Sequence, residues 1–339
     1  MTDSRSVEKK CPPRIGITIG DVAGIGAEIS LKAITDQSIL EICLPVLIGD
    51  ANFLFKSADD LGLKIDFEVI KKGEEIPSNS AKPIIYDLAN LTQPIELGKE
   101  SGIAGKAAGE YIETAVGLCL ENKIEAITTA PINKKSLAMG GYNFPGHTEM
   151  LAKLTNTHDF AMSFFAEKLR VVLLSTHVSL LEAIDLVKKD KLVDLIKFTY
   201  KELTKLLKKD VKIAVAGLNP HASEDGIFGN QEALEITPAI EECQKEFGIN
   251  VTGAYSPDTI FLRAYRGEFD AVVACYHDQA TIAVKCLSFG ESVNVTLGLP
   301  IIRTSVDHGT AFEIAGKNIA DCSSMKTAIK LAATLALDS

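Results

Sequence analysis

Short apolar runs and longer amphipathic segments alternate along the chain. Runs at residues 14–19, 126–130 and 271–275 consist mainly of Ile, Val, Ala and Thr, which is typical of strands buried on both faces of a sheet. Segments such as 52–61 and 191–207 carry apolar residues at helical spacing. This alternation predicts an α/β fold with a mostly parallel sheet and helices on both of its faces.

The same pattern places the other elements. Further strands are expected at residues 45–50, 66–70, 83–87, 161–165, 170–175 and 211–217, and further helices at 29–34, 102–120, 147–154 and 324–337. Residues 1–12 are expected to form a disordered leader, and the glycine-rich stretch 140–146 a linker between domains. We expect two α/β subdomains, formed by residues 11–138 with 300–339 and by residues 139–299.

Composition narrows the class of partner. The 339 residues are 46% hydrophobic and 24% charged, as in soluble globular proteins, and the net charge is −10. An acidic chain argues against nucleic acid or an anionic membrane as a partner, and an anionic substrate then needs a local cluster of positive groups. The seven cysteines are scattered without a CxxC pair, and neither a signal peptide nor an apolar run of ~20 residues is present. We therefore expect a cytoplasmic protein.

Polar residues gather between apolar runs in residues 270–316. The run 271–275 ends at the motif YHDQ (276–279), and ligands of open α/β sheets bind at the carboxyl ends of strands. The polar and charged side chains that follow are Lys285, Asn294, Arg303, Asp307, His308 and Thr310. Burying such groups unpaired costs about 1–3 kcal/mol each, so the whole set favours a site. For any one residue, a structural ion pair or a turn stays an open alternative.

Three of the six histidines follow apolar strands in the same way. His177, His221 and His277 stand in VVLLSTHVS, IAVAGLNPHAS and VVACYHDQ, and parallel strands bring their carboxyl ends to one edge. Three imidazoles with an open position form a catalytic metal arrangement, and nitrogen ligands favour zinc, cobalt or nickel over magnesium. Zinc is the expected metal, and cobalt, nickel, manganese and magnesium stay open alternatives. Asp258 and Asp278 are candidates to orient the rings. A structural role for each histidine stays open, because no compact metal motif is present.

Two further segments are candidates for binding an anion or a nucleotide. Residues 20–28 form a glycine-rich loop between a strand and a helix, but they match neither GxGxxG nor a P-loop, so a tight turn is an equal alternative. The helix that begins at His147 and Thr148 offers backbone N–H groups to an anion, although Thr148 also suits an N-cap. Further groups that can hold a phosphate and a carboxylate are Lys285, Asn294 and Arg303.

A series of motifs then occurs in one order along the chain: GDxAGIG, APINK, PGHTE, THVSL, LNPHA, PDT, YHDQ and VNVTLGLPIIRTSVDHGTA. From about Gly16 onwards, the chain resembles the 4-hydroxythreonine-4-phosphate dehydrogenase family of pyridoxine 5′-phosphate synthesis. The resemblance implies two α/β/α subdomains, related in fold to isocitrate and isopropylmalate dehydrogenases, with the active site in the cleft. Residues similar to the adenosine-binding loop of those enzymes, which imply NAD as cofactor, are Asp307, His308, Gly309, Thr310 and Ala311.

The resemblance also implies a role for each polar residue. The metal ligands would be His177 from one subunit of a homodimer, and His221 and His277 from its partner. The substrate contacts would be His147, Thr148, Lys285, Asn294 and Arg303. Asp258 and Asp278 would keep the catalytic site in order, and Lys285 is a candidate base by its position. The implied reaction is NAD-dependent oxidation of the 3-hydroxyl of 4-phosphooxy-L-threonine, followed by decarboxylation to 3-amino-2-oxopropyl phosphate.

Some positions depart from the family pattern. Val22, Ala27 and Ala283 stand where the family usually has proline, and Ala280 where it has glycine, while all the polar site residues remain. Other branches of the family oxidise D-threonate or D-erythronate 4-phosphate, and the motifs leave the branch open. Two hypotheses from other classes are a phosphate acyltransferase of similar fold, which needs no metal, and a non-catalytic binding protein.

Overall fold

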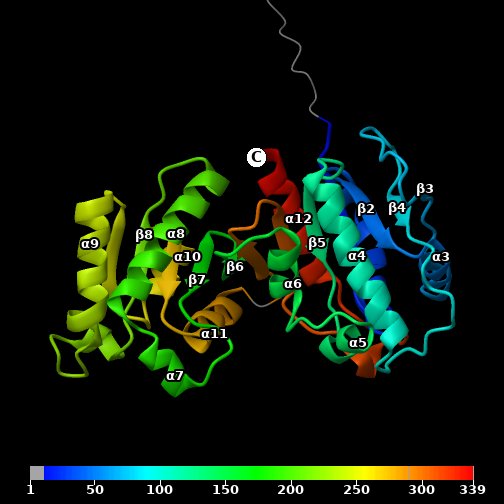
Figure 1. The fold of residues 1–339 in the computed structure, drawn as a ribbon. Helices are drawn as coiled ribbons and strands as arrows, with labels where there is room; N and C mark the ends of the chain where they lie inside the picture. The colour runs from blue at the N-terminus through cyan, green and yellow to red at the C-terminus, as the bar shows by residue number, and fades with distance from the viewer. Residues whose placement is uncertain (1–10, 289, 339) are drawn as a thin grey trace, which may run out of the picture. The chain divides into compact units, whose positions relative to one another are not determined.

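The computed structural model describes residues 11–288 and 290–338 (Figure 1). By its internal contacts the chain divides into two units. Unit 1 comprises the described part of Met1–Tyr142 together with Thr310–Ala320, and unit 2 comprises Asn143–Gly309 and the described part of Asp321–Ser339. The predicted leader, residues 1–12, falls mostly on residues 1–10, which lie outside the described residues.

The sheet of unit 1 has the strand order β3-β4-β2-β1-β5, and every pairing in it is parallel. Its strands are β1 (Arg14–Thr18), β2 (Leu44–Gly49), β3 (Glu68–Lys71), β4 (Ile84–Asp87) and β5 (Ala126–Thr129). The central strands β1, β2 and β5 are buried along nearly their whole length, as their apolar sequences predict.

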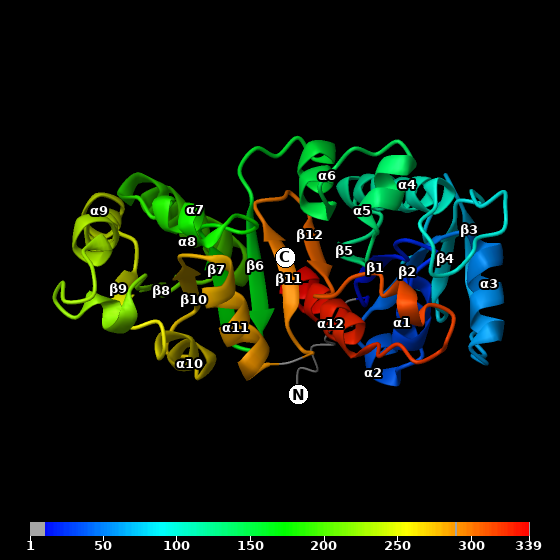
Figure 2. The same ribbon diagram turned by 90° about the horizontal axis from the view of Figure 1, so that it is seen from below.

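The helices of unit 1 cover both faces of this sheet. They are α1 (Gly26–Ile34), α2 (Gln37–Leu40), α3 (Ala51–Asp60), α4 (Gly102–Leu120), α5 (Lys134–Met139) and the 3-10 helix η3 (Phe312–Ile314). Figure 2 shows α4 and α5 on one face and α1 and α2 on the other. The small residues of α4 allow close packing on α5, because a Cβ atom at Gly105 would lie 1.7 Å from the carbonyl oxygen of Ser136.

The strands of unit 2 follow the order β12-β11-β6-β7-β10-β8-β9. They are β6 (Ala161–Ala166), β7 (Leu169–Leu173), β8 (Ile213–Ala216), β9 (Val251–Tyr255), β10 (Ala271–Ala274), β11 (Val293–Leu297) and β12 (Ile302–Ser305). The pairings from β7 to β9 are parallel, whereas those from β12 to β7 are antiparallel. The predicted mostly parallel α/β fold is confirmed, and the antiparallel strands are an addition that the alternation of elements did not predict.

Helices cover both faces of the unit 2 strands as well. They are α6 (His147–Leu154), α7 (Leu180–Asp185), α8 (Lys189–Leu207), α9 (Thr237–Phe247), α10 (Ile260–Tyr265), α11 (His277–Leu287) and α12 (Ser323–Asp338), with a 3-10 turn at Pro220–Ser223 and a π-helical turn at Glu232–Ile236. Successive residues of β10 belong to two different cores. Val273 packs in the core that includes residues of α8 and α9, and Val272 packs in the core that includes residues of α10 and α11.

The observed division differs from the expected one at the C-terminal end. Residues 300–339 were assigned to the first subdomain, but only Thr310–Ala320 belongs to unit 1. The physical reason is that β12 pairs with β11, and α12 packs on β11, β12 and α8, all within unit 2. The chain first passes from unit 1 to unit 2 after Tyr142, inside the predicted linker 140–146.

Across residues 11–288 and 290–338, no helix is both long enough and apolar enough to cross a membrane.

Candidate active site

The three predicted metal-binding histidines follow three neighbouring strands. β10 lies between β7 and β8 and is parallel to both, so the carboxyl ends of all three strands lie at one edge. His177 follows β7, His221 follows β8, and His277 follows β10 as the first residue of α11. The rings of His177 and His277 lie 5.7 Å apart, measured between their centroids. The predicted convergence of strand ends is therefore present, and two of the three rings are adjacent.

Of the two carboxylates predicted to orient these rings, one contacts a histidine. The Nδ1 atom of His277 lies 3.0 Å from Oδ1 of Asp278. If Nδ1 carries the proton and donates it to Asp278, the Nε2 lone pair of His277 is left free for a metal. Asp258 instead accepts a hydrogen bond from the Ser256 hydroxyl in its own loop, at 2.6 Å.

The loop of His221 has an unusual backbone that a buried carboxylate holds in place. Residues 221–225 all have positive φ, a conformation that non-glycine residues rarely adopt. The carboxylate of Glu232 accepts hydrogen bonds from the backbone N–H groups of Leu218 and Asn219 and from the Asn219 amide, at 2.7–2.8 Å. The loop before His221 is thereby fixed to the turn that begins at Glu232.

One side chain links the loop of His221 to the loop of His277. The Gln279 amide nitrogen donates to the carbonyl of Gly217, and its oxygen accepts from the backbone N–H of Cys275, both at 2.7 Å. Gln279 thus ties the end of β8 to the end of β10. The motif YHDQ contains Gln279 but does not indicate this linking role, and no motif surrounds Glu232 that would have identified it from the sequence.

The three histidines have the right donor atoms for a divalent metal, but one chain does not bring all three together. Imidazole nitrogens suit zinc, cobalt and nickel, and His177 and His277 present two of them side by side. His221 packs its ring near Phe228, at 6.1 Å between centroids. No group of three His, Cys, Asp or Glu side chains within the described ranges is arranged to hold a metal ion.

A second polar group lies buried on β11 and β12. Asn294 and Thr296 alternate along β11, so their side chains share one face, and Arg303 of β12 donates to the Thr296 hydroxyl at 3.1 Å. Arg303 is 3% exposed, and burial lowers its pKa to about 9 although the charge of Glu149 acts in the opposite direction. The Oδ1 atom of Asn294 is buried without a hydrogen-bond partner in the described part of the chain.

The positive charge of Arg303 acts on the pKa of His147. Burial, and then the positive charge of Arg303, lower the pKa of His147 well below its ordinary value, so the ring is neutral near pH 7. Its Nε2 atom is buried and has no partner among the described residues, although part of the residue's surface remains exposed. His147 is the first residue of α6 and Thr148 the second. Thr148 is therefore not the N-cap, which is Gly146 and makes no side-chain hydrogen bond.

Lys285 pairs with the first residue of the predicted cofactor loop. Its Nζ atom lies 3.4 Å from Oδ2 of Asp307, and the Ser292 hydroxyl lies at the same distance from that oxygen. The Lys285 side chain is 47% exposed, in the last turn of α11. Sequence reasoning placed Lys285 with the substrate and Asp307 with the cofactor, and the structure brings the two side chains together.

The remaining cofactor-loop residues lie around the passage from unit 2 to unit 1. His308 is exposed and its Nδ1 atom lies 3.0 Å from the carbonyl oxygen of Gly309. The carbonyl of Thr310 accepts from the backbone N–H of Ile25, and Ala311 has a left-handed backbone with φ 44°. Thr310 thus contacts the glycine-rich loop 20–28, where a Cβ atom at Gly24 would lie 2.8 Å from the Thr310 oxygen. That loop is a tight turn on which Thr310 packs, and no GxGxxG-like function is needed to explain its glycines.

The fold and the polar residues at its strand ends define an α/β protein of the class that binds ligands at a sheet edge. The chain belongs to the family described as Pyridoxal phosphate biosynthetic protein PdxA, whose model matches residues 41–332. The family resemblance inferred from the motifs is thereby confirmed.

Close relatives bear two different names. The chain is 45% identical over 325 residues to D-threonate 4-phosphate dehydrogenase of Cupriavidus necator, covering 96% of this chain and 97% of that protein. Among solved structures, 4-hydroxythreonine-4-phosphate dehydrogenase of Klebsiella pneumoniae is 39% identical with a TM-score of 0.88, covering 96% of this chain and 99% of that chain. The Burkholderia phymatum protein of the same name is 43% identical with a TM-score of 0.85, covering 96% and 98%.

A more distant likeness concerns the fold alone. EutD phosphotransacetylase of Staphylococcus aureus is 12% identical with a TM-score of 0.51, covering 96% of this chain and 94% of that chain. The fold similarity to phosphate acyltransferases that sequence analysis expected is therefore present, and it carries no information on activity.

Proposed function

We propose that the protein oxidises, with NAD and a divalent metal, the 3-hydroxyl of a four-carbon hydroxy acid phosphorylated at C4. The observation that carries the proposal is the buried group of Arg303, His147 and Asn294. A buried guanidinium beside a neutral imidazole and an unsatisfied amide oxygen suits an oxyanion with neighbouring hydroxyl groups. The chain as a whole is acidic, so a local gathering of positive groups needs an explanation. A phosphate on the substrate, with its negative charge, would provide one.

Within this class, D-threonate 4-phosphate is the first candidate substrate. It is the substrate named for the Cupriavidus necator relative, which is 45% identical over nearly all of both chains. The second candidate is 4-phosphooxy-L-threonine, the substrate that the family resemblance implies. The names of the Klebsiella and Burkholderia structures favour this acid. The two acids differ in what C2 carries, a hydroxyl or an amino group.

The chain's own residues would bind the substrate and move protons. Arg303, Asn294 and the first turn of α6 would hold the acid's charged groups, and neutral His147 can donate or accept a hydrogen bond without adding charge. Lys285 is the candidate base, and its Nζ atom lies 3.4 Å from the Asp307 carboxylate. His177, His221 and His277 would hold the metal, which when bound lowers the pKa of the substrate hydroxyl.

The atoms of the reaction balance as follows. The C3 hydroxyl loses its proton to the base and C3 loses a hydride to NAD, which gives NADH and a 3-oxo acid. The 3-oxo acid loses CO₂, and the enolate that remains takes up a proton at C2. D-threonate 4-phosphate would yield dihydroxyacetone phosphate, and 4-phosphooxy-L-threonine would yield 3-amino-2-oxopropyl phosphate.

We further infer that the metal site is shared between the two subunits of a homodimer. Large apolar side chains are exposed a short way along the chain from each histidine: Leu181 in α7 is 73% exposed, Ile227 in the loop after Pro220–Ser223 72% and Ile282 in α11 64%. Exposed apolar side chains of this size suit a protein interface. A partner at this surface would also explain why the ligand set is not complete in one described chain.

The proposal is tested by NADH formation. Purified protein loaded with zinc, cobalt or manganese is incubated with NAD and one acid at a time. The acids are D-threonate 4-phosphate, D-erythronate 4-phosphate and 4-phosphooxy-L-threonine. We expect NADH and CO₂ in equal amounts, with D-threonate 4-phosphate giving the highest kcat/KM. Absence of NADH with every acid, in protein shown to bind metal, would contradict the dehydrogenase. Acyl transfer from acetyl phosphate to coenzyme A without metal would favour the acyltransferase, and ligand binding without turnover the binding protein.

A further inference from the structure

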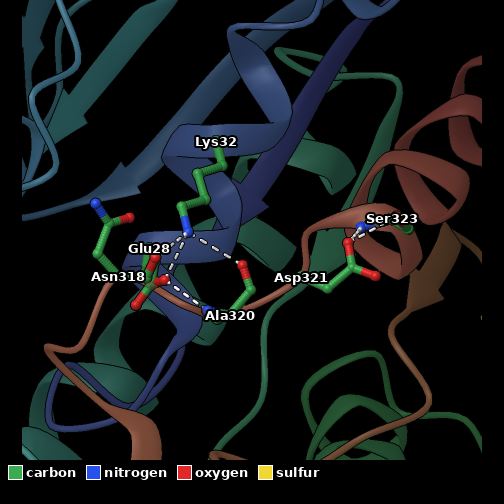
Figure 3. A network of polar contacts seen from close by, with 6 residues as sticks. All are labelled: Glu28, Lys32, Asn318, Ala320, Asp321 and Ser323. Carbon is green, nitrogen blue, oxygen red and sulfur yellow. Dashed lines mark hydrogen bonds and ion pairs between the residues drawn. The ribbon is translucent and has the colours of Figure 1, made fainter.

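The segment Thr310–Ala320 of unit 1 is fixed to α1 and the loop before it at both of its ends. At the first end, the backbone N–H of Ile25 donates to the Thr310 carbonyl at 3.1 Å. At the far end, Glu28 and Lys32 of α1 hold Ala320 (Figure 3). Residues 316–319 between these anchors are exposed, whereas Ala320 is buried. The far anchor therefore holds the end of the exposed part of the segment, whose Gly316 also lies against Leu97.

The far anchor is a compact charged group. Oε1 of Glu28 accepts from Nζ of Lys32 at 2.8 Å and from the backbone N–H of Ala320 at 2.9 Å. Nζ of Lys32 also donates to the carbonyls of Asn318, at 3.2 Å, and Ala320, at 3.1 Å. All three N–H donors of the ammonium group thus have an acceptor, and the carboxylate is 7% exposed. Glu28 is buried although the Lys32 side chain is 22% exposed, so removing the ammonium group would leave a buried carboxylate without its cation.

We propose that Glu28 and Lys32 are positioning residues for the dinucleotide, because they keep the 310–320 segment in its binding conformation before the dinucleotide arrives. This inference rests on the proposed function, with NAD as cofactor, and on the family resemblance, which implies that Thr310 and Ala311 belong to the loop that contacts it. A segment that is already ordered loses little conformational freedom on binding, so its affinity for the ligand is higher than that of a mobile segment. Neither residue belongs to the reacting groups, so the effect falls on dinucleotide affinity and leaves the chemical step unchanged.

The test compares Lys32→Met with Lys245→Met. Methionine keeps most of the apolar stem and removes all three donors. Lys245 of α9 is the matched control, because it pairs with Glu241 at the same i, i+4 spacing and distance of 2.8 Å but, within residues 11–288 and 290–338, makes no hydrogen bond or ion pair with another segment. We expect Lys32→Met to raise the Kd for NADH and the KM for NAD about tenfold, which corresponds to ~1.4 kcal/mol. We expect kcat and the KM for the phosphorylated acid to stay within about twofold, and Lys245→Met to change none of these values.

Amide hydrogen exchange of the ligand-free proteins supplies a readout that does not depend on activity. Lys32→Met should speed the exchange of residues 316–320, whereas the backbone of β1 and β2 should exchange as in the wild type. Lys32→Arg, which keeps a cation with several donors, should restore part of the affinity and of the protection. If Lys32→Met does not fold, Glu28→Gln tests the same group, since the amide oxygen still accepts from Ala320.

The outcomes separate this inference from the proposed function. The positioning role would be overturned if wild type and Lys32→Met bound NADH equally, or if residues 316–320 exchanged equally in both. The proposed dehydrogenase activity would not be affected by either result. A wild type that neither binds NADH nor forms it would overturn the proposed function, and the positioning role with it. Weaker binding together with faster local exchange in Lys32→Met alone would support both.

Discussion

The 310–320 segment and the loops that carry His177, His221 and His277 differ in how much of their surroundings one chain supplies. The segment is anchored by Ile25, Glu28 and Lys32, all of which belong to unit 1. The histidine loops are mostly exposed, are surrounded by exposed apolar side chains, and bring only two of their three rings together. Under the proposed function, one chain would supply the contacts that hold the proposed dinucleotide loop, while a second copy would complete the proposed metal site.

The strongest test of that comparison mixes two inactive variants. His177→Ala and His277→Ala are each expected to lose essentially all activity and bound metal, because each lacks one ligand. If a site takes His177 from one subunit and His221 and His277 from the other, a mixed dimer keeps one intact site. Random exchange of subunits then restores about one quarter of wild-type activity.

The contrary outcome of the mixing experiment is equally informative. The 5.7 Å between the rings of His177 and His277 also allows one chain to use both for the same metal. In that case every site of a mixed dimer lacks a ligand, and no activity returns. Each variant exchanged with itself under the same conditions is the control, and bound metal is measured alongside activity.

The next largest effect is expected for the buried arginine. Arg303→Lys removes the planar fork and leaves a point charge, so we expect kcat/KM to fall about 10²–10³-fold, mostly through the KM of the acid. Arg170→Lys is the control, since Arg170 is a half-buried arginine of the same sheet and burial lowers its pKa as well. Equal losses in the two variants would indicate a general cost of replacing a buried arginine instead of a contact with the substrate.

A smaller effect is expected where one side chain links two histidine loops. Gln279→Met leaves the carbonyl of Gly217 and the N–H of Cys275 without their partner, so His221 and His277 should lose their fixed spacing. We expect metal affinity, measured by competition with a chelator, to fall about 10–100-fold. The matched control is Gln244→Met in α9, which also removes a hydrogen bond from a side-chain amide to a backbone carbonyl, that of Val251. Unchanged metal affinity in Gln279→Met would mean that the link stabilises the sheet only.

The sequence predicted the parts of the fold and site that depend on local pattern. Apolar runs gave β1, β5 and β10, and the polar groups after them gave the strand ends at which His177, His221 and His277 lie. The order β7-β10-β8 could not be predicted, because periodicity identifies strands without giving their neighbours. For that reason the link made by Gln279 was missed, since it exists only when β8 lies beside β10.

The C-terminal boundary was missed for a related reason. The sequence VNVTLGLPIIRTSVD was recognised as a motif, but its two strands pair antiparallel, which the alternation of strands and helices does not indicate. Because β12 pairs with β11, Arg303 and Asn294 come to lie on the same face of adjacent strands. The buried polar group therefore depends on a pairing that only the structure gives.

The smallest effect concerns the pH dependence of stability. His147 has a folded-state pKa well below 6.5, its ordinary value, so between these two values the unfolded chain binds a proton that the folded chain does not. Stability is therefore complete above pH 6.5 and falls as the pH decreases, by at most ~1.4 kcal/mol per pH unit, until the folded pKa is reached. Urea unfolding at pH 7.5, 6.5 and 5.5 should show this loss in the wild type and less of it in His147→Gln, whose side chain does not titrate. The same loss in both proteins would assign the effect to other groups, and the Arg303 site would then not depend on a neutral His147.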